Sequence, residues 1–74
     1  MKVKVRLFGF LAEAAGRPEV TVEASTAGEA LEAVKSRVEV PKSVRIAVNE
    51  DYAPAKTALR PGDVVSLIPP VAGG

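Results

Sequence analysis

Polar and apolar residues alternate at the start of the chain. Val3 and Val5 fall on one side of residues 1–7, and two lysines and an arginine fall on the other. Alternation with a period of two is typical of a strand that has one face on a hydrophobic core. Residues 19–24 repeat the pattern, so the two segments predict an antiparallel pair of strands. Acidic residues on the second strand oppose the basic ones on the first, which favours a neutralised, solvated face over a basic binding stripe.

A short helix and a longer one are predicted by other spacings. Residues 10–15 favour one or two helical turns, which Gly16 ends. Thr26 and Glu29 have the spacing of a capping box, in which the threonine hydroxyl accepts an early helical N–H and the glutamate returns to the N–H of the cap. The apolar stripe that follows predicts the main helix and its core-facing side. This stripe consists of Ala27, Ala30, Leu31, Val34 and Val38.

The second half of the chain predicts three more strands. Residues 44–48 alternate, residues 52–53 suit a short edge strand, and residues 64–68 form a β-branched run with the length of a buried strand. Asn49 lies in the turn after the first of these, where its amide favours a structural role over a catalytic one. The Pro-Gly pair at residues 61–62 suits a type II turn that leads into the last strand.

This order of elements predicts an α+β fold with one sheet and one main helix packed on one face. In so small a domain the first and last strands most economically lie side by side and parallel at the centre of the sheet, with their hairpin partners outside. That arrangement is the β-grasp, or ubiquitin-like, fold, with a mixed sheet of four to five strands. We expect residues 1–70 to form this domain and residues 71–74 to form an extended tail.

Composition narrows the possible functions. The 74 residues are 47% hydrophobic and 26% charged, and the net charge of +1 gives no electrostatic signature for nucleic acid or a membrane. The alternating start does not resemble a signal peptide, so we expect a cytoplasmic protein. The chain has no cysteine and no histidine, and it therefore lacks thiolates, disulfides and the commonest general base and metal ligand. We expect no enzymatic activity of its own, and no cofactor or metal bound by the chain.

The carboxyl-terminal segment carries the clearest candidate chemistry. Pro69 and Pro70 must end the last strand, and they favour stiff, extended backbone that projects the four residues beyond them. Fully extended, those four residues reach roughly 13 Å, enough to enter the cleft of another protein. Gly73 adds no side chain that would block a narrow channel, and the α-carboxylate of Gly74 is the reactive group. Because an ionised carboxylate is inert as an acyl donor, an activating partner is implied, for example one that uses ATP.

A partner surface is predicted beside this tail. Strand alternation turns Ala47 and Ile68 away from the main helix, and Phe8 continues the outward side of the first strand. With Val71 these residues would form an apolar patch next to the point where the tail leaves the domain. The alternative is that they are scattered surface hydrophobic residues, which are ordinary in soluble proteins.

Several segments occur together in this chain. They are the first strand with its continuation Phe8-Gly9-Phe10, the capped helix from Thr26, Ala47-Val48-Asn49-Glu50, and Pro61-Gly62-Asp63 leading through Leu67-Ile68-Pro69-Pro70-Val71-Ala72-Gly73-Gly74. In this combination the chain resembles, over its whole length, the small ubiquitin-like subunit of molybdopterin synthase. The terminal block is the most specific part of the resemblance. Ala72 departs from relatives that often have serine there.

The resemblance implies a sulfur carrier. An ATP-dependent enzyme would adenylate Gly74, and a sulfur-donating desulfurase or rhodanese-like protein would supply sulfur to give a thiocarboxylate. The tail would then insert into the large catalytic subunit of molybdopterin synthase, in a heterotetramer, and donate its sulfur to a pterin precursor to form the dithiolene of molybdopterin. The chain itself would be a non-catalytic subunit of that sulfurtransferase complex, in molybdenum or tungsten cofactor biosynthesis.

Related functions share the same terminus. Sulfur carriers for thiamine or for tRNA thiolation, and ubiquitin-like protein modifiers, have the β-grasp fold and a Gly-Gly end. The long connection between the first two strands and the Pro-Pro pair resemble the molybdopterin group more than the thiamine carriers. A different class of function is a β-grasp interaction module in which the glycines are incidental.

Overall fold

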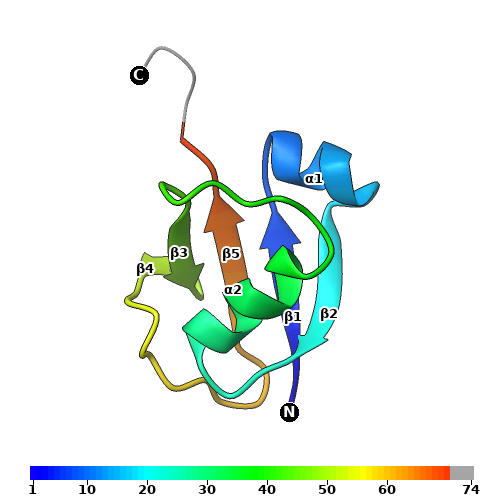
Figure 1. The fold of residues 1–74 in the computed structure, drawn as a ribbon. Coiled ribbons are helices and arrows are strands. Elements are labelled where there is room, and N and C mark those ends of the chain that lie inside the picture. The colour runs from blue at the N-terminus through cyan, green and yellow to red at the C-terminus, as the bar shows by residue number, and fades with distance from the viewer. Residues whose placement is uncertain (71–74) are drawn as a thin grey trace.

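Five strands and two helices form the part of the chain that the computed structural model describes, residues 1–70 (Figure 1). Helix α2 lies across one face of the sheet, and α1 lies at the end of the sheet where β1 finishes. Neither helix has the length and apolarity needed to cross a membrane. In chain order the elements are β1 (Lys2–Leu7), α1 (Phe10–Ala15), β2 (Glu19–Glu23), α2 (Ala27–Lys35), β3 (Arg45–Val48), β4 (Asp51–Tyr52) and β5 (Val64–Ile68).

Strands β1 and β5 are the neighbours that join the two halves of the sheet. The strand order is β2-β1-β5-β3-β4. β1 and β5 are parallel, with Val5 opposite Val65 and Leu7 opposite Leu67, and the remaining pairs are antiparallel. The predicted β-grasp arrangement is therefore confirmed, with five strands and one main helix.

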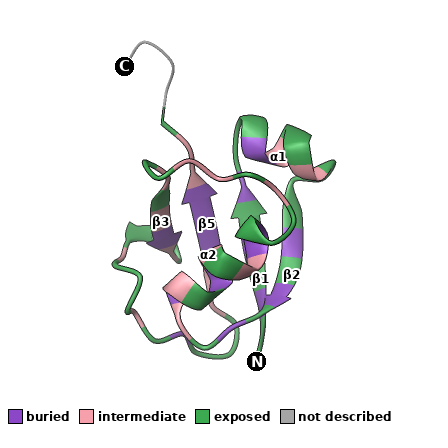
Figure 2. Ribbon diagram, in the orientation of Figure 1, coloured by how far each residue is buried: buried purple, intermediate pink, exposed green. Residues whose placement is uncertain are grey.

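The core lies between the sheet and α2. Alternate residues of the strands face it, and α2 contributes Ala27, Ala30 and Val34, all of them buried. Figure 2 shows this burial along β5 and at alternate positions of β1 and β2. Leu31 and Val38, also predicted in the helical stripe, are only partly buried against the core. The largest fully buried side chains are those of Leu11, Leu67, Val5, Val34 and Val65.

The capping box of α2 forms with one change of partner. Thr26 Oγ1 accepts the Glu29 N–H at 3.2 Å, as predicted, but Glu29 Oε1 accepts the N–H of Ser25, at 2.6 Å, instead of that of Thr26. The reason lies in tertiary pairing, because the chain entering α2 is bonded to residues 57–59. Leu59 N–H donates to Ser25 O and Ala27 N–H donates to Thr57 O, and this pairing fixes the approach to the helix.

The connection between β3 and β4 is a two-residue hairpin turn. Asn49 and Glu50 both have positive φ, 51° and 73°, as a type I′ turn requires. Asparagine tolerates this conformation, but glutamate there costs on the order of 1 kcal/mol, and glycine is the favoured residue. The turn places Tyr52 opposite Ala47 and Asp51 opposite Val48, so the edge strand is 51–52 and not the predicted 52–53.

Asn49 and Asp63 clamp this hairpin to the start of β5. The Asn49 amide donates to Asp63 Oδ1 at 2.8 Å, and its oxygen accepts the Val64 N–H at 3.0 Å. Asp63 Oδ2 accepts the Arg60 N–H at 2.9 Å across the predicted turn, in which Gly62 has φ 91°. The structural role expected of Asn49 is confirmed. The bond from the Arg60 N–H, and then the bond from Asn49, lower the pKa of Asp63 below its ordinary 3.8.

The lowered pKa predicts how Asp63 contributes to stability as pH changes. Because the folded state favours the ionised carboxylate, its stabilising effect is present above pH ~4 and is lost as pH falls through the folded pKa. Asp63→Asn should therefore lower the urea midpoint of unfolding most near neutral pH, and the gap to the wild-type chain should narrow in acid. Urea unfolding at a series of pH values measures that gap. A gap of constant width down to about pH 2 would contradict the assigned role of the carboxylate.

Candidate functional site

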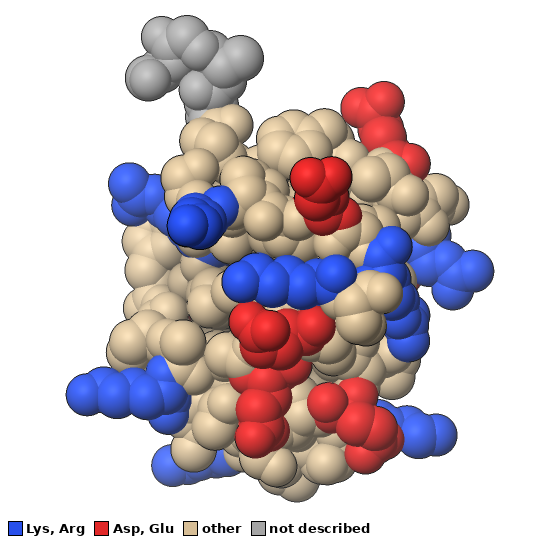
Figure 3. Space-filling view, viewed as in Figure 1, with Lys and Arg blue, Asp and Glu red and all other residues tan. Residues whose placement is uncertain are grey.

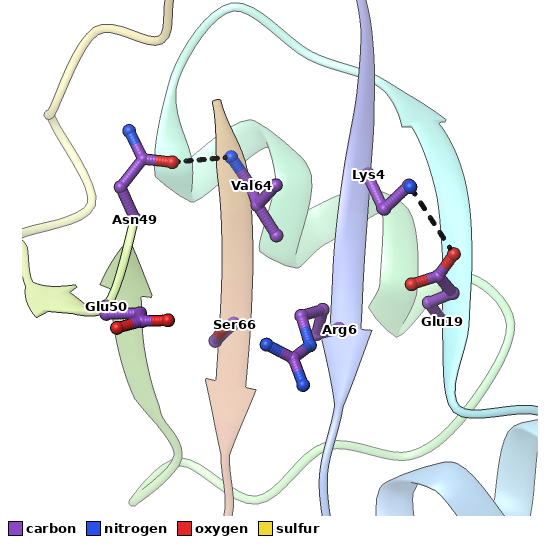
Figure 4. Close-up of a pocket in the computed structure, with 7 residues that line it drawn as sticks. All are labelled: Lys4, Arg6, Glu19, Asn49, Glu50, Val64 and Ser66. Carbon is purple, nitrogen blue, oxygen red and sulfur yellow. Dashed lines mark hydrogen bonds and ion pairs between the residues drawn. The ribbon is translucent and has the colours of Figure 1, made fainter. Parts of the chain in front are cut away.

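The face of the sheet opposite α2 is open, and two hollows lie on it. Figure 4 views this face with α2 behind the strands. Arg6, Glu50 and Ser66 line both hollows, so the two share a border. Arg6 and Glu50 reach toward β5 from either side of Ser66 (Figure 4).

The first, which we call the apolar hollow because its lining is mainly apolar, measures about 390 Å³. It contains all three described residues of the predicted partner patch, Phe8, Ala47 and Ile68. The fourth, Val71, lies outside the described residues, as do Gly73 and Gly74. The full lining is Arg6, Phe8, Ala47, Glu50, Tyr52, Ser66 and Ile68.

Ala47 contributes to this hollow differently from the prediction. It does point away from α2, but it is only 3% exposed, and Ser66 beside it is only 6% exposed. Both side chains are small and sit on central strands, where larger neighbours such as Tyr52 and Arg6 overhang them. They therefore form the floor of the hollow, while Phe8, 37% exposed, and Tyr52, 68% exposed, stand higher at its sides.

Arginine side chains accompany both aromatic rings. The Arg6 guanidinium carbon lies 5.3 Å from the Phe8 ring centroid, and that of Arg45 lies 5.6 Å from the Tyr52 centroid. Both distances suit cation–π contact. Sequence reasoning missed four lining residues, Arg6, Glu50, Tyr52 and Ser66. A two-residue turn at 49–50 was the signal that could have placed Tyr52 opposite Ala47.

The second, which we call the polar hollow, measures about 510 Å³ and has a mainly polar lining (Figure 4). Lys4 Nζ lies 3.6 Å from Glu19 Oε1, and the amino terminus of Met1 lies 3.7 Å from Glu23 Oε1. These pairs agree with the neutralised face that the sequence predicts for β1 and β2. Exposed pairs of this kind contribute little stability, about 1 kcal/mol or less. The lining is Lys4, Arg6, Glu19, Asn49, Glu50, Val64 and Ser66.

The apolar hollow adjoins the place where the described chain leaves the sheet. Ile68 ends β5 and lines the hollow, and Pro69 follows it. Gly9 has φ 56°, and a β-carbon there would lie 3.2 Å from Pro69 Cγ. The corner between β1 and α1 thus packs against the base of the tail, and only glycine fits there without displacement.

The helix face of the molecule has a different character. Figure 3 shows acidic and basic side chains interspersed over it. On α2, Lys35 Nζ lies 3.3 Å from Glu32 Oε2. A separate hollow lies between α1 and the segment after α2, and its lining is Phe10, Ala14, Glu39, Val40 and Pro41.

Residues 1–70 contain no group of three side chains that could hold a metal ion. The geometry on the open face suits protein docking better than catalysis.

Comparison with known proteins agrees with this architecture. The ThiS family model matches residues 5–74. SAMP1 from Haloferax volcanii is 29% identical, with a TM-score of 0.84 over 100% of both chains. A putative molybdopterin converting factor subunit 1 from Pyrococcus furiosus is 31% identical, with a TM-score of 0.81 over 96% of this chain and 99% of that one.

A third structure contains a partner. It is the protein–protein complex of subunits 1 and 2 of the molybdopterin-converting factor from Helicobacter pylori, and a chain in it is 32% identical, with a TM-score of 0.63 over 100% of both chains. The family match covers nearly the whole chain, and the neighbours share its topology. The chain therefore belongs to the ThiS family and is a small sulfur carrier with the ubiquitin-like β-grasp fold.

Proposed function

We propose that this chain is the sulfur carrier subunit of molybdopterin synthase. The observation that carries the proposal is the course of β5, which runs at the centre of the sheet past an apolar hollow and directly into Pro69-Pro70, after which the sequence ends in Gly73-Gly74. The similarity to molybdopterin converting factor subunit 1 in two organisms supports this pathway. We place the protein in the cytoplasm, where ATP is available for activation.

The proposed chemistry takes place at Gly74 and needs no side chain of this protein. The carboxylate displaces pyrophosphate from ATP on an activating enzyme, and the terminal sulfur of a persulfide on a desulfurase or rhodanese-like donor then displaces AMP from the acyl-adenylate. A second thiol attacks the resulting acyl disulfide, so that the donor leaves as a disulfide and the tail is released with the sulfur. The product is a thiocarboxylate. The absence of cysteine and histidine fits this scheme, because the chain has no thiol that could hold a persulfide and no imidazole to act as a general base.

The role proposed for the domain is to dock and to present the tail. A thiocarboxylate is a sulfur nucleophile, and the pocket of the large catalytic subunit would position it against the pterin precursor. The apolar hollow lies beside Pro69, so a partner that bound there would bury Phe8 and Ile68 and receive the tail at the same time. Gly73 allows the backbone to pass through a narrow channel. The chain would bind no cofactor itself.

A second function has a specific observation in its favour. The structural similarity to SAMP1, named small archaeal modifier protein 1, suggests a protein modifier. The same activated Gly74 would then acylate a lysine amine of a target protein instead of accepting sulfur. Carriers for thiamine or tRNA thiolation would use the same thiocarboxylate. Dithiolene formation with the large subunit distinguishes the molybdopterin pathway from these alternatives.

Deletion of Gly74 should separate docking from chemistry. The folded domain ends near Pro69, so the deletion should leave the unfolding midpoint unchanged and should preserve much of the affinity for the large subunit. It moves the carboxylate back by about 3.5 Å, one extended residue. An error of ~1 Å in the position of a reacting group can cost 10²-fold in rate. Thiocarboxylate formation and dithiolene product should therefore be abolished, and turnover near the wild-type level would refute the role of Gly74.

Ile68→Lys should disrupt docking on the open face. A lysine in the wall of the apolar hollow places a charge where the partner would bury apolar surface, and we expect affinity for the large subunit to fall at least tenfold, roughly the loss typical of an interface centre. Thr21→Lys is the matched control, because Thr21 lies on β2, outside both hollows. Isothermal titration with both variants measures the effect, after circular dichroism has confirmed folding. Equal affinity of the two variants would show that the hollow is not the docking site.

A further inference from the structure

Glu50 occupies a position that the fold alone would give to glycine. It is the second residue of the two-residue turn and has φ 73°, a left-handed conformation in which a β-carbon is unfavourable. Asn49, the first residue of the turn, is explained by the fold, since its amide clamps the hairpin to Asp63 and Val64. No comparable reason within the fold accounts for Glu50.

The Glu50 carboxylate has no partner among residues 1–70. It is exposed, and it takes part in none of the hydrogen bonds or ion pairs of that part of the chain. Of the basic residues in the polar hollow, Lys4 pairs with Glu19, and Arg6, which lies over the Phe8 ring, forms no ion pair among residues 1–70. Within that part of the chain the carboxylate therefore has no ion-pair partner.

The position of Glu50 relates it to docking. It lines both hollows and reaches toward β5 next to Ser66, at the border between the apolar and the polar surface (Figure 4). A strained backbone conformation persists where the surrounding structure holds it in place, and such positions concentrate at binding sites. A charge at the rim of an apolar contact selects the partner that presents the opposite charge.

We propose that Glu50 is a specificity determinant of the docking face. Its carboxylate accepts a hydrogen-bonded ion pair from a lysine or arginine of the large subunit of molybdopterin synthase. An apolar side chain beside that cation fills the hollow above Ala47 and Ser66. This inference rests on the proposed function, which supplies the partner, and it adds the chemistry by which the partner is selected.

Two substitutions separate the binding role from the backbone strain. Glu50→Gln keeps the strained β-carbon but removes the charge, and Glu50→Gly removes both. Asp51→Asn is the matched control: it removes the same charge from the adjacent residue, which strand alternation turns to the other face from Tyr52. Affinity for the purified large subunit, measured by titration at low and at high salt, and the urea midpoint of unfolding are the two readouts.

We expect opposite effects of one substitution on stability and on binding. Glu50→Gly should raise the unfolding midpoint and weaken binding about tenfold at low salt, as expected for a lost charge-assisted hydrogen bond. Glu50→Gln should weaken binding to the same extent with an unchanged midpoint and a smaller salt dependence, while Asp51→Asn should bind as the wild-type chain does.

Two results would overturn the inference. Wild-type affinity in both Glu50 variants would exclude a contact from the carboxylate. If Asp51→Asn weakened binding to the large subunit equally, the effect would arise from the net charge of the chain and not from the position of Glu50. Failure of the wild-type chain itself to bind the large subunit would contradict the proposed function as well, so the two failures are distinguishable.

Discussion

The parallel pairing of β1 with β5 is the interaction on which the rest of the molecule depends. It joins the two hairpin halves of the sheet and sets Val65 and Leu67, both fully buried, against α2. Because side chains alternate along a strand, a slip of one residue would bring Ile68 into the core and turn Leu67 out. The pairing thus fixes the core and also decides which residues of β5 form the open face. It further fixes the point at which the chain leaves the sheet, since Pro69 follows β5 directly and packs against the corner at Gly9.

In the proposed function, Ile68 at the end of β5 belongs to the docking face, and the sequence continues from it to the reactive Gly74. In the proposed complex, docking through Phe8 and Ile68 would place the start of the tail at a set distance from the partner, and the chain has no histidine or cysteine of its own. The clamp of Asn49 on Asp63 and Val64 holds the β3–β4 hairpin to the same strand, so the strained Glu50 is held at the rim of the hollow. Positioning by rigid elements is what a group-transfer reaction between two proteins requires. The catalytic groups can then belong entirely to the enzymes that the carrier visits.

The local signals in the sequence predicted most of the fold. Alternation in residues 1–7, the hydroxyl of Thr26 and the Pro-Gly turn before β5 each act over a few neighbouring residues, and each formed as expected. The features that escaped prediction depend on contacts between distant segments. Glu29 bonds to Ser25 because residues 57–59 hold the chain entering α2, and Ala47 is buried because the turn at Asn49 sets Tyr52 opposite it. Of the residues of the hollow that sequence reasoning missed, three come from three different strands and Glu50 comes from the β3–β4 turn, and the register of the sheet brings them together.

Intact-mass analysis of the protein purified from its own cells tests the central claim most directly. A sulfur carrier should contain a population whose mass corresponds to the replacement of one oxygen by sulfur, and fragmentation should place that sulfur on Gly74. Treatment with the large subunit and its pterin precursor should return this population to the unmodified mass. Sulfur on an internal residue, or a chain found only unmodified or joined to lysine amines, would contradict the account.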